Sequence, residues 1–262
     1  MYCSIQSFYK AAKAPKWRAR KPESVVEEIA CLWTTYKVTD FIFIDDDFIP
    51  PTDEGRARAY EIATLLLKRG LLITFHITCN AKAVEESLFT LLKKAGLRSV
   101  SLGIESADPK ILKKMNKFIA VEDAKRAVAI LNRIKLAIDF GMIFFNPFTT
   151  VETLKSDLNL MRIIGEYKPN ILPLNRMKLR RGTPGYAMMA KAGYEEEPNG
   201  EIRWEFTDEN IKKIYKIFLD VFALETRGQE TINRIVREGI NQLKRTGGKR
   251  ADILLVQELF QK

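Results

Sequence analysis

The first candidates for chemistry are three consecutive carboxylates, Asp45, Asp46 and Asp47, which directly follow an apolar run at residues 41–44. Like charges packed this closely repel one another, so they need a cation, an ammonium group or ample water nearby. Two interpretations stay open. The carboxylates bind a cation such as magnesium or an ammonium group, or they form a solvated loop before a helix that Asp53 caps.

Two further polar residues, Glu105 and Ser106, leave the end of another apolar run. Asp108 followed by Pro109 is typical of a helix start, because aspartate caps the first turn and proline fits its first position. This explains Asp108 but gives Glu105 no structural role, so Glu105 and Ser106 are candidate ligand-binding residues. Phe145 ends a later apolar run, where it could stack on a planar ligand or pack in the core.

The chain has three cysteines, Cys3, Cys31 and Cys79, and one histidine, His76. This odd, sparse set does not indicate a disulfide framework, and we expect a reducing, cytoplasmic location. A single histidine nearly excludes a histidine-based zinc or iron site. Cys79 is expected to be a buried packing residue, and His76, between two apolar residues, a hydrogen-bonded structural histidine.

Composition is that of a globular protein with a sizeable core, since 46% of the residues are hydrophobic and 29% are charged. The net charge is +10, but the basic residues are spread over several segments, which favours a solvated basic surface over a nucleic-acid site. No apolar run approaches the roughly 18 to 20 residues that span a bilayer. The N-terminus does not have the pattern of a signal peptide.

The chain alternates short apolar runs with amphipathic segments. Strands are predicted at residues 39–44, 71–78, 98–104, 136–145 and 170–174. Helices are predicted at residues 23–36, 53–69, 84–94, 108–115, 121–134 and 151–166. This alternation predicts a parallel sheet covered by helices. The pattern alone does not choose between an open sheet and a barrel, and about five strands are too few for an eight-stranded barrel.

The pattern changes after residue 182. Helices are predicted at residues 207–222, 229–244 and 251–260, and no strand pattern follows. We therefore predict two domains, an α/β domain over residues 1–182 and a helical extension over residues 183–262.

Taken in order, several segments resemble motifs of the radical S-adenosylmethionine (radical SAM) superfamily, closest to the group whose members often carry a cobalamin-binding domain. Tyr2-Cys3 matches the end of its Cys-x-x-x-Cys-x-aromatic-Cys motif. The other matching segments, which follow the successive strands, are residues 43–48, 103–106, 141–150 and 182–184. The resemblance covers about residues 1–195 and implies a partial (β/α)6 TIM-like barrel that lacks its first strand.

The resemblance also implies cofactors. In the family, three thiolates hold a 4Fe–4S cluster, and Cys3 matches one of them. The other two would fall before residue 1, so we expect a chain truncated inside the motif. Such a chain would be inactive alone because one thiolate cannot hold the cluster, and Cys31 and Cys79 lack the spacing to substitute. Cobalamin would bind through a missing upstream domain.

Further roles follow from the resemblance. The three aspartates would hold the methionine ammonium of S-adenosylmethionine (SAM), where negative charge is apt. Glu105 and Ser106 would contact the ribose, and Ile143 and Phe145 would bracket the adenine. Lys117 is the candidate cation for the SAM carboxylate, although a solvated lysine after a helix is the simpler interpretation.

The expected partners are an unidentified small-molecule substrate and an electron donor such as flavodoxin or ferredoxin. Two rival functions stay open at this point. One is a magnesium-dependent barrel enzyme that uses Asp45–Asp47, and the other is a basic module that binds RNA or another anion.

Overall fold

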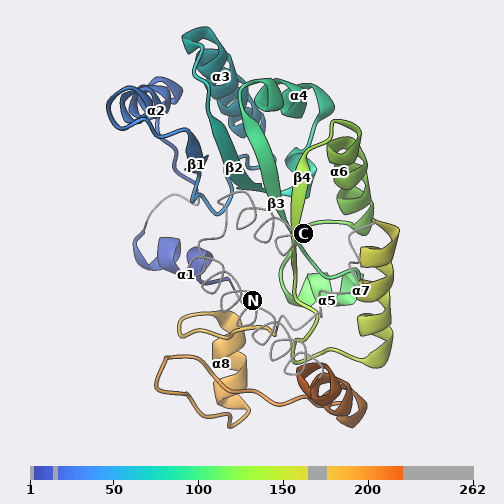
Figure 1. Ribbon diagram of the computed structural model, residues 1–262. Helices are drawn as coiled ribbons and strands as arrows, with labels where there is room; N and C mark the ends of the chain where they lie inside the picture. The colour runs from blue at the N-terminus through green and yellow to red at the C-terminus, as the bar shows by residue number, and fades with distance from the viewer. Residues whose placement is uncertain (1–2, 14–16, 165–175, 221–262) are drawn as a thin grey trace, which may run out of the picture. The chain divides into compact units, whose positions relative to one another are not determined.

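The computed structural model describes residues 3–13, 17–164 and 176–220 (Figure 1). These residues fall into two compact units. The first contains the described residues up to Asp208, and the second contains the helical residues 209–220. None of the described helices is long and apolar enough to cross a membrane.

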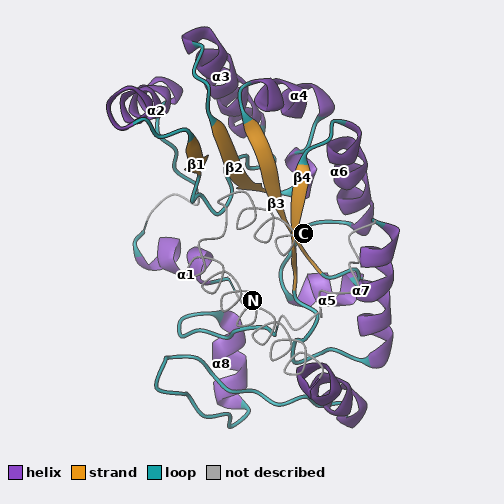
Figure 2. Ribbon diagram, in the orientation of Figure 1, coloured by secondary structure: helices purple, strands orange, loops and turns teal. Residues whose placement is uncertain are grey.

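The centre of the first unit is a four-stranded, all-parallel sheet with the strand order β1-β2-β3-β4 (Figure 2). The strands are β1 (Asp40–Ile42), β2 (Thr74–Cys79), β3 (Leu97–Glu105) and β4 (Ala137–Met142). The sheet is not closed, and the expected partial barrel is confirmed. The predicted strand at residues 170–174 lies outside the described residues, although Phe145, just after β4, forms a parallel bridge with Arg176.

Helices cover one face of this sheet. They are α2 (Pro22–Tyr36), α3 (Asp53–Arg69), α4 (Glu86–Lys94) and α6 (Val121–Arg133), with the short 3-10 turn η1 (Ala81–Ala83) before α4. Neighbouring helices of this layer contact each other, α4 contacts β3, and α6 contacts β4 (Figure 1). Phe75, Ile77 and Cys79 of β2 are buried, while the alternating His76 and Thr78 are only half-buried. The sheet therefore has an apolar face under the helices and a polar face opposite.

Four further helices complete the first unit. They are α1 (Ser4–Ala11), α5 (Pro109–Lys114), α7 (Val151–Ile163) and α8 (Pro184–Lys191). Side-chain oxygens cap three of them, because Asp108 accepts from backbone amides at the start of α5, Thr150 at the start of α7 and Thr183 at the start of α8. The residues that follow strands β3 and β4 thus determine where helices α5 and α7 begin.

The residues after the predicted domain boundary are only partly helical. Residues 184–191 and 209–220 form helices, but residues 192–206 do not. Two antiparallel bridges, Arg180–Glu201 and Glu196–Ile202, form there instead. Pro198 and Gly200 disfavour a helix in this segment, since proline removes a donor and glycine is flexible. The division between residues 182 and 183 stays a prediction.

Candidate cofactor site

Glu105, the last residue of β3, is the first element of the site. Its backbone has a φ of 69°, a left-handed conformation that is uncommon for a residue other than glycine. The register between β3 and β4 shifts between Gly103 and Glu105, and the Glu105 carbonyl accepts from the backbone amide of Ile143 at 2.8 Å. The residue is 8% exposed. Backbone strain of this kind is often found at ligand-binding sites.

Lys117 provides the positive charge that partners Glu105. Its Nζ lies 3.0 Å from Glu105 Oε1; Glu105 is buried and Lys117 is half-buried. The local chain path explains this encounter, because Asn116 has a φ of 57° and ends the α5 turn with a reversal. Lys117 is therefore an ion-paired residue at the strand ends and not simply a solvated lysine.

Gly103 leaves the room that this ion pair needs. A Cβ atom at Gly103 would lie 2.9 Å from Glu105 Oε1 and 3.1 Å from Lys117 Nζ. Both distances are tighter than ordinary contacts, so any larger residue would push the ion pair away from β3. The predicted motif Gly103–Ser106 thus has a physical reason for its glycine.

Asp47 extends the site to the loop after β1. Its Oδ1 accepts from the backbone amide of Asn80 at 3.2 Å. Burial raises the pKa of Asp47 to about 6, although the Asn80 amide and the positive charge of Lys117 oppose that rise. Asp47, Glu105 and Lys117 thus come from the ends of three segments and interact at one edge of the sheet. This is the edge where ligands bind in parallel α/β folds.

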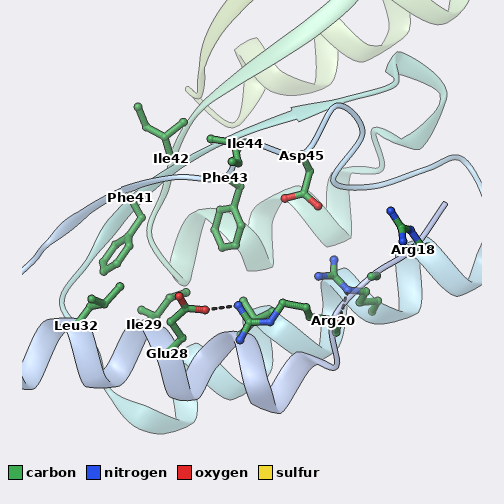
Figure 3. Close-up of a pocket in the computed structure, with 13 residues that line it drawn as sticks. Arg18, Arg20, Glu28, Ile29, Leu32, Phe41, Ile42, Phe43, Ile44 and Asp45 are labelled. Atoms are coloured by element: carbon green, nitrogen blue, oxygen red, sulfur yellow. Dashed lines mark hydrogen bonds and ion pairs between the residues drawn. The ribbon is translucent and has the colours of Figure 1, made fainter. Parts of the chain in front are cut away.

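Asp45 and Asp46 do not share this position. Asp46 is exposed, and Asp45 lines a separate cavity of about 470 Å³ between α2 and β1 (Figure 3). Phe41 and Phe43 point into this cavity toward α2, and Arg58 lines it as well. The three consecutive aspartates therefore separate into different environments.

Arg58 also holds the segment that precedes α2. Its guanidinium lies 6.0 Å from the ring centroid of Trp17 and 5.3 Å from that of Phe48. Its Nε donates to the backbone carbonyl of Arg20 at 3.1 Å. Burial lowers the pKa of Arg58, and the nearby carboxylate of Asp45 opposes this effect. These contacts attach residues 17–20 to the helix layer.

Ser106 belongs to a buried network that the sequence did not predict. Its hydroxyl donates to Asp157 Oδ1 of α7 at 2.8 Å, and the backbone amide of Ala107 donates to the same oxygen. Burial raises the pKa of Asp157 to about 7, with both hydrogen bonds opposing the rise. Ser106 is fully buried, so the geometry gives it a role in supporting the Glu105 loop, and a ribose contact remains only a prediction.

A sequence signal for Asp157 was present. It stands three residues after Leu154 and three before Leu160, in the buried stripe of α7. A charged residue at an apolar position of an amphipathic helix indicates a hydrogen-bonded buried group.

The two predicted adenine residues differ in accessibility. Ile143 is half-buried and adjoins Glu105 through its backbone hydrogen bond. Phe145 is completely buried and its ring packs edge-to-face on Phe206, with 5.7 Å between the centroids. The structure therefore brings Ile143 to the Glu105 edge and gives Phe145 a place in the core.

The cysteines have different surroundings. Cys3 is exposed at the start of α1, and Cys31 is exposed on α2. Cys79 is buried, and its burial raises the pKa of the thiol, as expected for a packing residue. Among the described residues, no group of three or more His, Cys, Asp or Glu side chains could hold a metal ion. The described thiols therefore do not fit a three-cysteine cluster site by themselves.

The parallel sheet and the charged groups at its carboxyl edge define a barrel-type α/β enzyme scaffold. The profile of the Radical SAM superfamily matches residues 1–161. The chain belongs to the radical SAM superfamily. Members of this superfamily are enzymes, and membership implies SAM and a 4Fe–4S cluster as cofactors.

Individual relatives agree with this assignment. The chain is 31% identical over 163 residues to an anaerobic magnesium-protoporphyrin IX monomethyl ester cyclase of Rubrivivax gelatinosus, a match that covers 62% of this chain and 28% of the cyclase. It is 28% identical over 133 residues to an uncharacterized methyltransferase of Pyrococcus horikoshii, which covers 51% of this chain and 27% of that protein. The matches thus span less than a third of each relative.

Among solved structures, the fold resembles that of the cobalamin-dependent SAM radical enzyme OxsB with aqua-cobalamin bound. The TM-score is 0.67 at 15% identity, and the match covers 94% of this chain and 46% of OxsB. At this identity the likeness concerns the fold.

Proposed function

We propose that the chain binds SAM at the carboxyl edge of its sheet, as the part of a radical SAM enzyme that positions the sulfonium for reductive cleavage. The observation that carries this proposal is the Glu105–Lys117 ion pair beside Asp47. SAM offers groups of matching chemistry, namely an ammonium, a carboxylate and a ribose diol.

The charges suggest a division of roles. Lys117 has three donors, so it can keep its bond to Glu105 while it donates to the SAM carboxylate. Asp47 is the carboxylate of the aspartate loop that lies nearest this pair, and we assign it to the methionine ammonium. Glu105 would accept from a ribose hydroxyl, with Ser106 and Asp157 holding its loop from behind. Ile143 would contact the adenine.

When bound, the iron–sulfur cluster and SAM supply the radical chemistry, while the protein binds, orients and excludes water. Cys3 is the candidate cluster ligand, but the described cysteines do not complete the set. We therefore propose that residues 1–262 alone do not assemble the cluster. Iron analysis after anaerobic reconstitution tests this, because an uptake of about four irons per chain would contradict it.

The cobalamin-dependent fold neighbour supports one further proposal. Cobalamin would take part in the reaction and would be bound outside the barrel residues. The substrate would be a small molecule, and an electron donor such as flavodoxin or ferredoxin would supply the reducing equivalent. Among the described residues, no observation favours the RNA-binding interpretation, and none favours the magnesium interpretation, since the three aspartates separate and no group of three or more His, Cys, Asp or Glu side chains could hold a metal ion.

Calorimetric titration with SAM tests the site. Lys117→Ala should weaken binding about 10- to 100-fold, as expected for the loss of a hydrogen bond between charged groups. Lys110→Ala is the matched control, because Lys110 is an exposed lysine of the neighbouring helix α5. An unchanged affinity in Lys117→Ala, or an equal loss in Lys110→Ala, would refute the assignment.

A further inference from the structure

The sheet face opposite helices α4 and α6 carries a polar network that none of the roles above uses. It consists of His76 on β2, Ser99 and Ser101 on β3, and Asp139 on β4. The strand register pairs His76 with Ser99 and Ser101 with Asp139, so all four side chains share one face. The first three are half-buried and Asp139 is exposed.

The hydrogen bonds of this network have a fixed direction. The Ser101 hydroxyl donates to Asp139 Oδ2 at 3.0 Å. Its single proton is thereby used, so the contact of 3.1 Å with His76 Nε2 requires Nε2 to donate. In the neutral ring, Nδ1 then accepts from the Ser99 hydroxyl at 2.8 Å. His76 and the serines thus orient the Asp139 carboxylate, which keeps a second oxygen for another donor.

The charge of Asp139 is not compensated within the described residues. No lysine or arginine of the described ranges forms an ion pair with it. Its neighbours on the same face of β4 are Ala137 and Gly141, both exposed and both small. A carboxylate that is oriented, accessible and flanked by small residues is suited to bind a donor from a ligand.

The same face becomes apolar toward β1. Ile42 pairs with His76 in the strand register and is 71% exposed, and Ile44 is 93% exposed. Figure 3 shows both isoleucines pointing away from α2, opposite to Phe41 and Phe43. An apolar surface therefore adjoins the polar network directly.

We propose that this face is the substrate-recognition surface, with Asp139 binding an ammonium or another hydrogen-bond donor and Ile42 contacting an apolar portion of the same molecule. The inference rests on the proposed function, since it names the class of substrate for that site. The substrate is accordingly an amphipathic amine or a similar cation. Asp139 is the binding residue, and His76 and Ser101 are positioning residues.

The placement relative to the cofactor site supports this assignment. Ser101 and Glu105 lie four residues apart on β3, about 13 Å along the strand. Gly103 and Gly141 pair between them, and a Cβ at Gly141 would lie 3.4 Å from Gly103 Cα. The Glu105–Lys117 pair covers Gly103, so the Asp139 network begins on the same face only two residues earlier, and ligands at the two sites would lie next to one another.

The single histidine makes a direct test possible. Imidazole nitrogen NMR of the whole chain gives the signals of His76 alone, because the sequence has no second histidine. The probes are butylammonium and butanoate at equal ionic strength, which share an alkyl chain and differ in charge. Butylammonium should shift the His76 signals in a saturable manner, and butanoate should not.

Variants identify the binding group. Asp139→Asn should weaken butylammonium binding about three- to fivefold, as expected for one accessible ion pair. Asp40→Asn, which changes another carboxylate of the same face two residues before Ile42, should bind as the wild type does. Ile42 lies three strands from Asp139, about 14 Å away, so Ile42→Ser should weaken binding of decylammonium, whose chain can reach it, and leave butylammonium binding unchanged. It serves as a second variant if Asp139→Asn fails to fold.

Three results would overturn the proposal: no saturable shift with butylammonium, an equal response to butanoate, or equal losses in Asp139→Asn and Asp40→Asn. The measurement needs neither SAM nor a cluster. If the protein does not bind SAM but responds to butylammonium, the proposed cofactor site is rejected and this surface stands. If it binds SAM but does not respond to butylammonium, only this surface is rejected.

Discussion

The buried carboxyl of Asp157 makes the stability of the protein depend on pH in an unusual direction. Burial raises its pKa from the ordinary 3.8 to about 7, and the side chain is 2% exposed. Between these values the folded protein keeps a proton that the unfolded chain releases. The resulting stabilisation is complete below about pH 4 and is lost as the pH rises through 7, about 4 kcal/mol in total.

Asp157→Asn isolates this effect, because asparagine can accept the same two hydrogen bonds and has no proton to lose. Below about pH 4 we expect similar free energies of unfolding for variant and wild type. At pH 5 the variant should be the more stable by about 1 to 2 kcal/mol, because the unfolded wild type has lost its proton, and by pH 8 by about 4 kcal/mol, since the whole window has then been crossed. Urea unfolding at pH 5, 6, 7 and 8 measures the difference, in which other titrating groups cancel.

A second variant separates titration from hydrogen bonding. Asp157→Ala leaves the Ser106 hydroxyl and the Ala107 amide without their acceptor, so relative to Asp157→Asn it should cost about 1 to 3 kcal/mol at every pH. If the difference between wild type and Asp157→Asn is constant with pH, or if the wild type gains stability relative to the variant as the pH rises, Asp157 is ionised in the folded protein and the reasoning is wrong.

Three further outcomes are expected. Gly96→Ala should destabilise the protein by about 3 kcal/mol or more in thermal unfolding, because φ is 114° and the new Cβ would lie 2.3 Å from the Ile73 carbonyl oxygen. The control is Gly70→Ala, where the new Cβ meets open space and the cost should be about 1 kcal/mol. Equal losses in the two variants would contradict the argument. Iodoacetamide should label two thiols per folded chain and spare Cys79, as mass spectrometry can check; a rapid third adduct without denaturant would show that Cys79 is accessible. Gly103→Ala should weaken SAM binding in calorimetry by displacing the ion pair above it, and wild-type affinity would show that the contact is not needed.

The four strands and their covering helices could be predicted because strands appear in the sequence as short apolar runs and helices as amphipathic segments. The helix at Asp53–Arg69 was predicted with its observed bounds, since Gly70 ends it in a left-handed conformation. The helices α1 and α8 were not predicted. Each has eight residues, about two turns, and two turns give too little periodicity to recognise.

The site was only partly predictable. Asp47, Glu105 and Lys117 were each candidates, but their association depends on the left-handed conformations of Glu105 and Asn116, which side-chain patterns do not encode. Asp139 interrupts an apolar strand, a visible signal whose meaning depends on its neighbours in β3. The separation of Asp45 from Asp47 likewise follows from packing around Arg58 and Asn80.

The stacking of Arg58 on Trp17 has a consequence for how the protein opens. The segment from Trp17 to Arg20 joins α1, at whose start Cys3 lies, to the helix layer, and the Arg58 guanidinium holds it by one aromatic contact and one backbone hydrogen bond. Arg20 adds an ion pair to Glu28 of α2 and hydrogen bonds to Ser24. These hydrogen bonds are exposed, so the segment is a local unfolding unit that can detach at a lower free energy than the sheet. The part of the tryptophan emission that a Trp17→Phe variant lacks thus reports on access to the Cys3 end of the protein, because Trp33 and Trp204 supply the remainder. This part should change before the core melts.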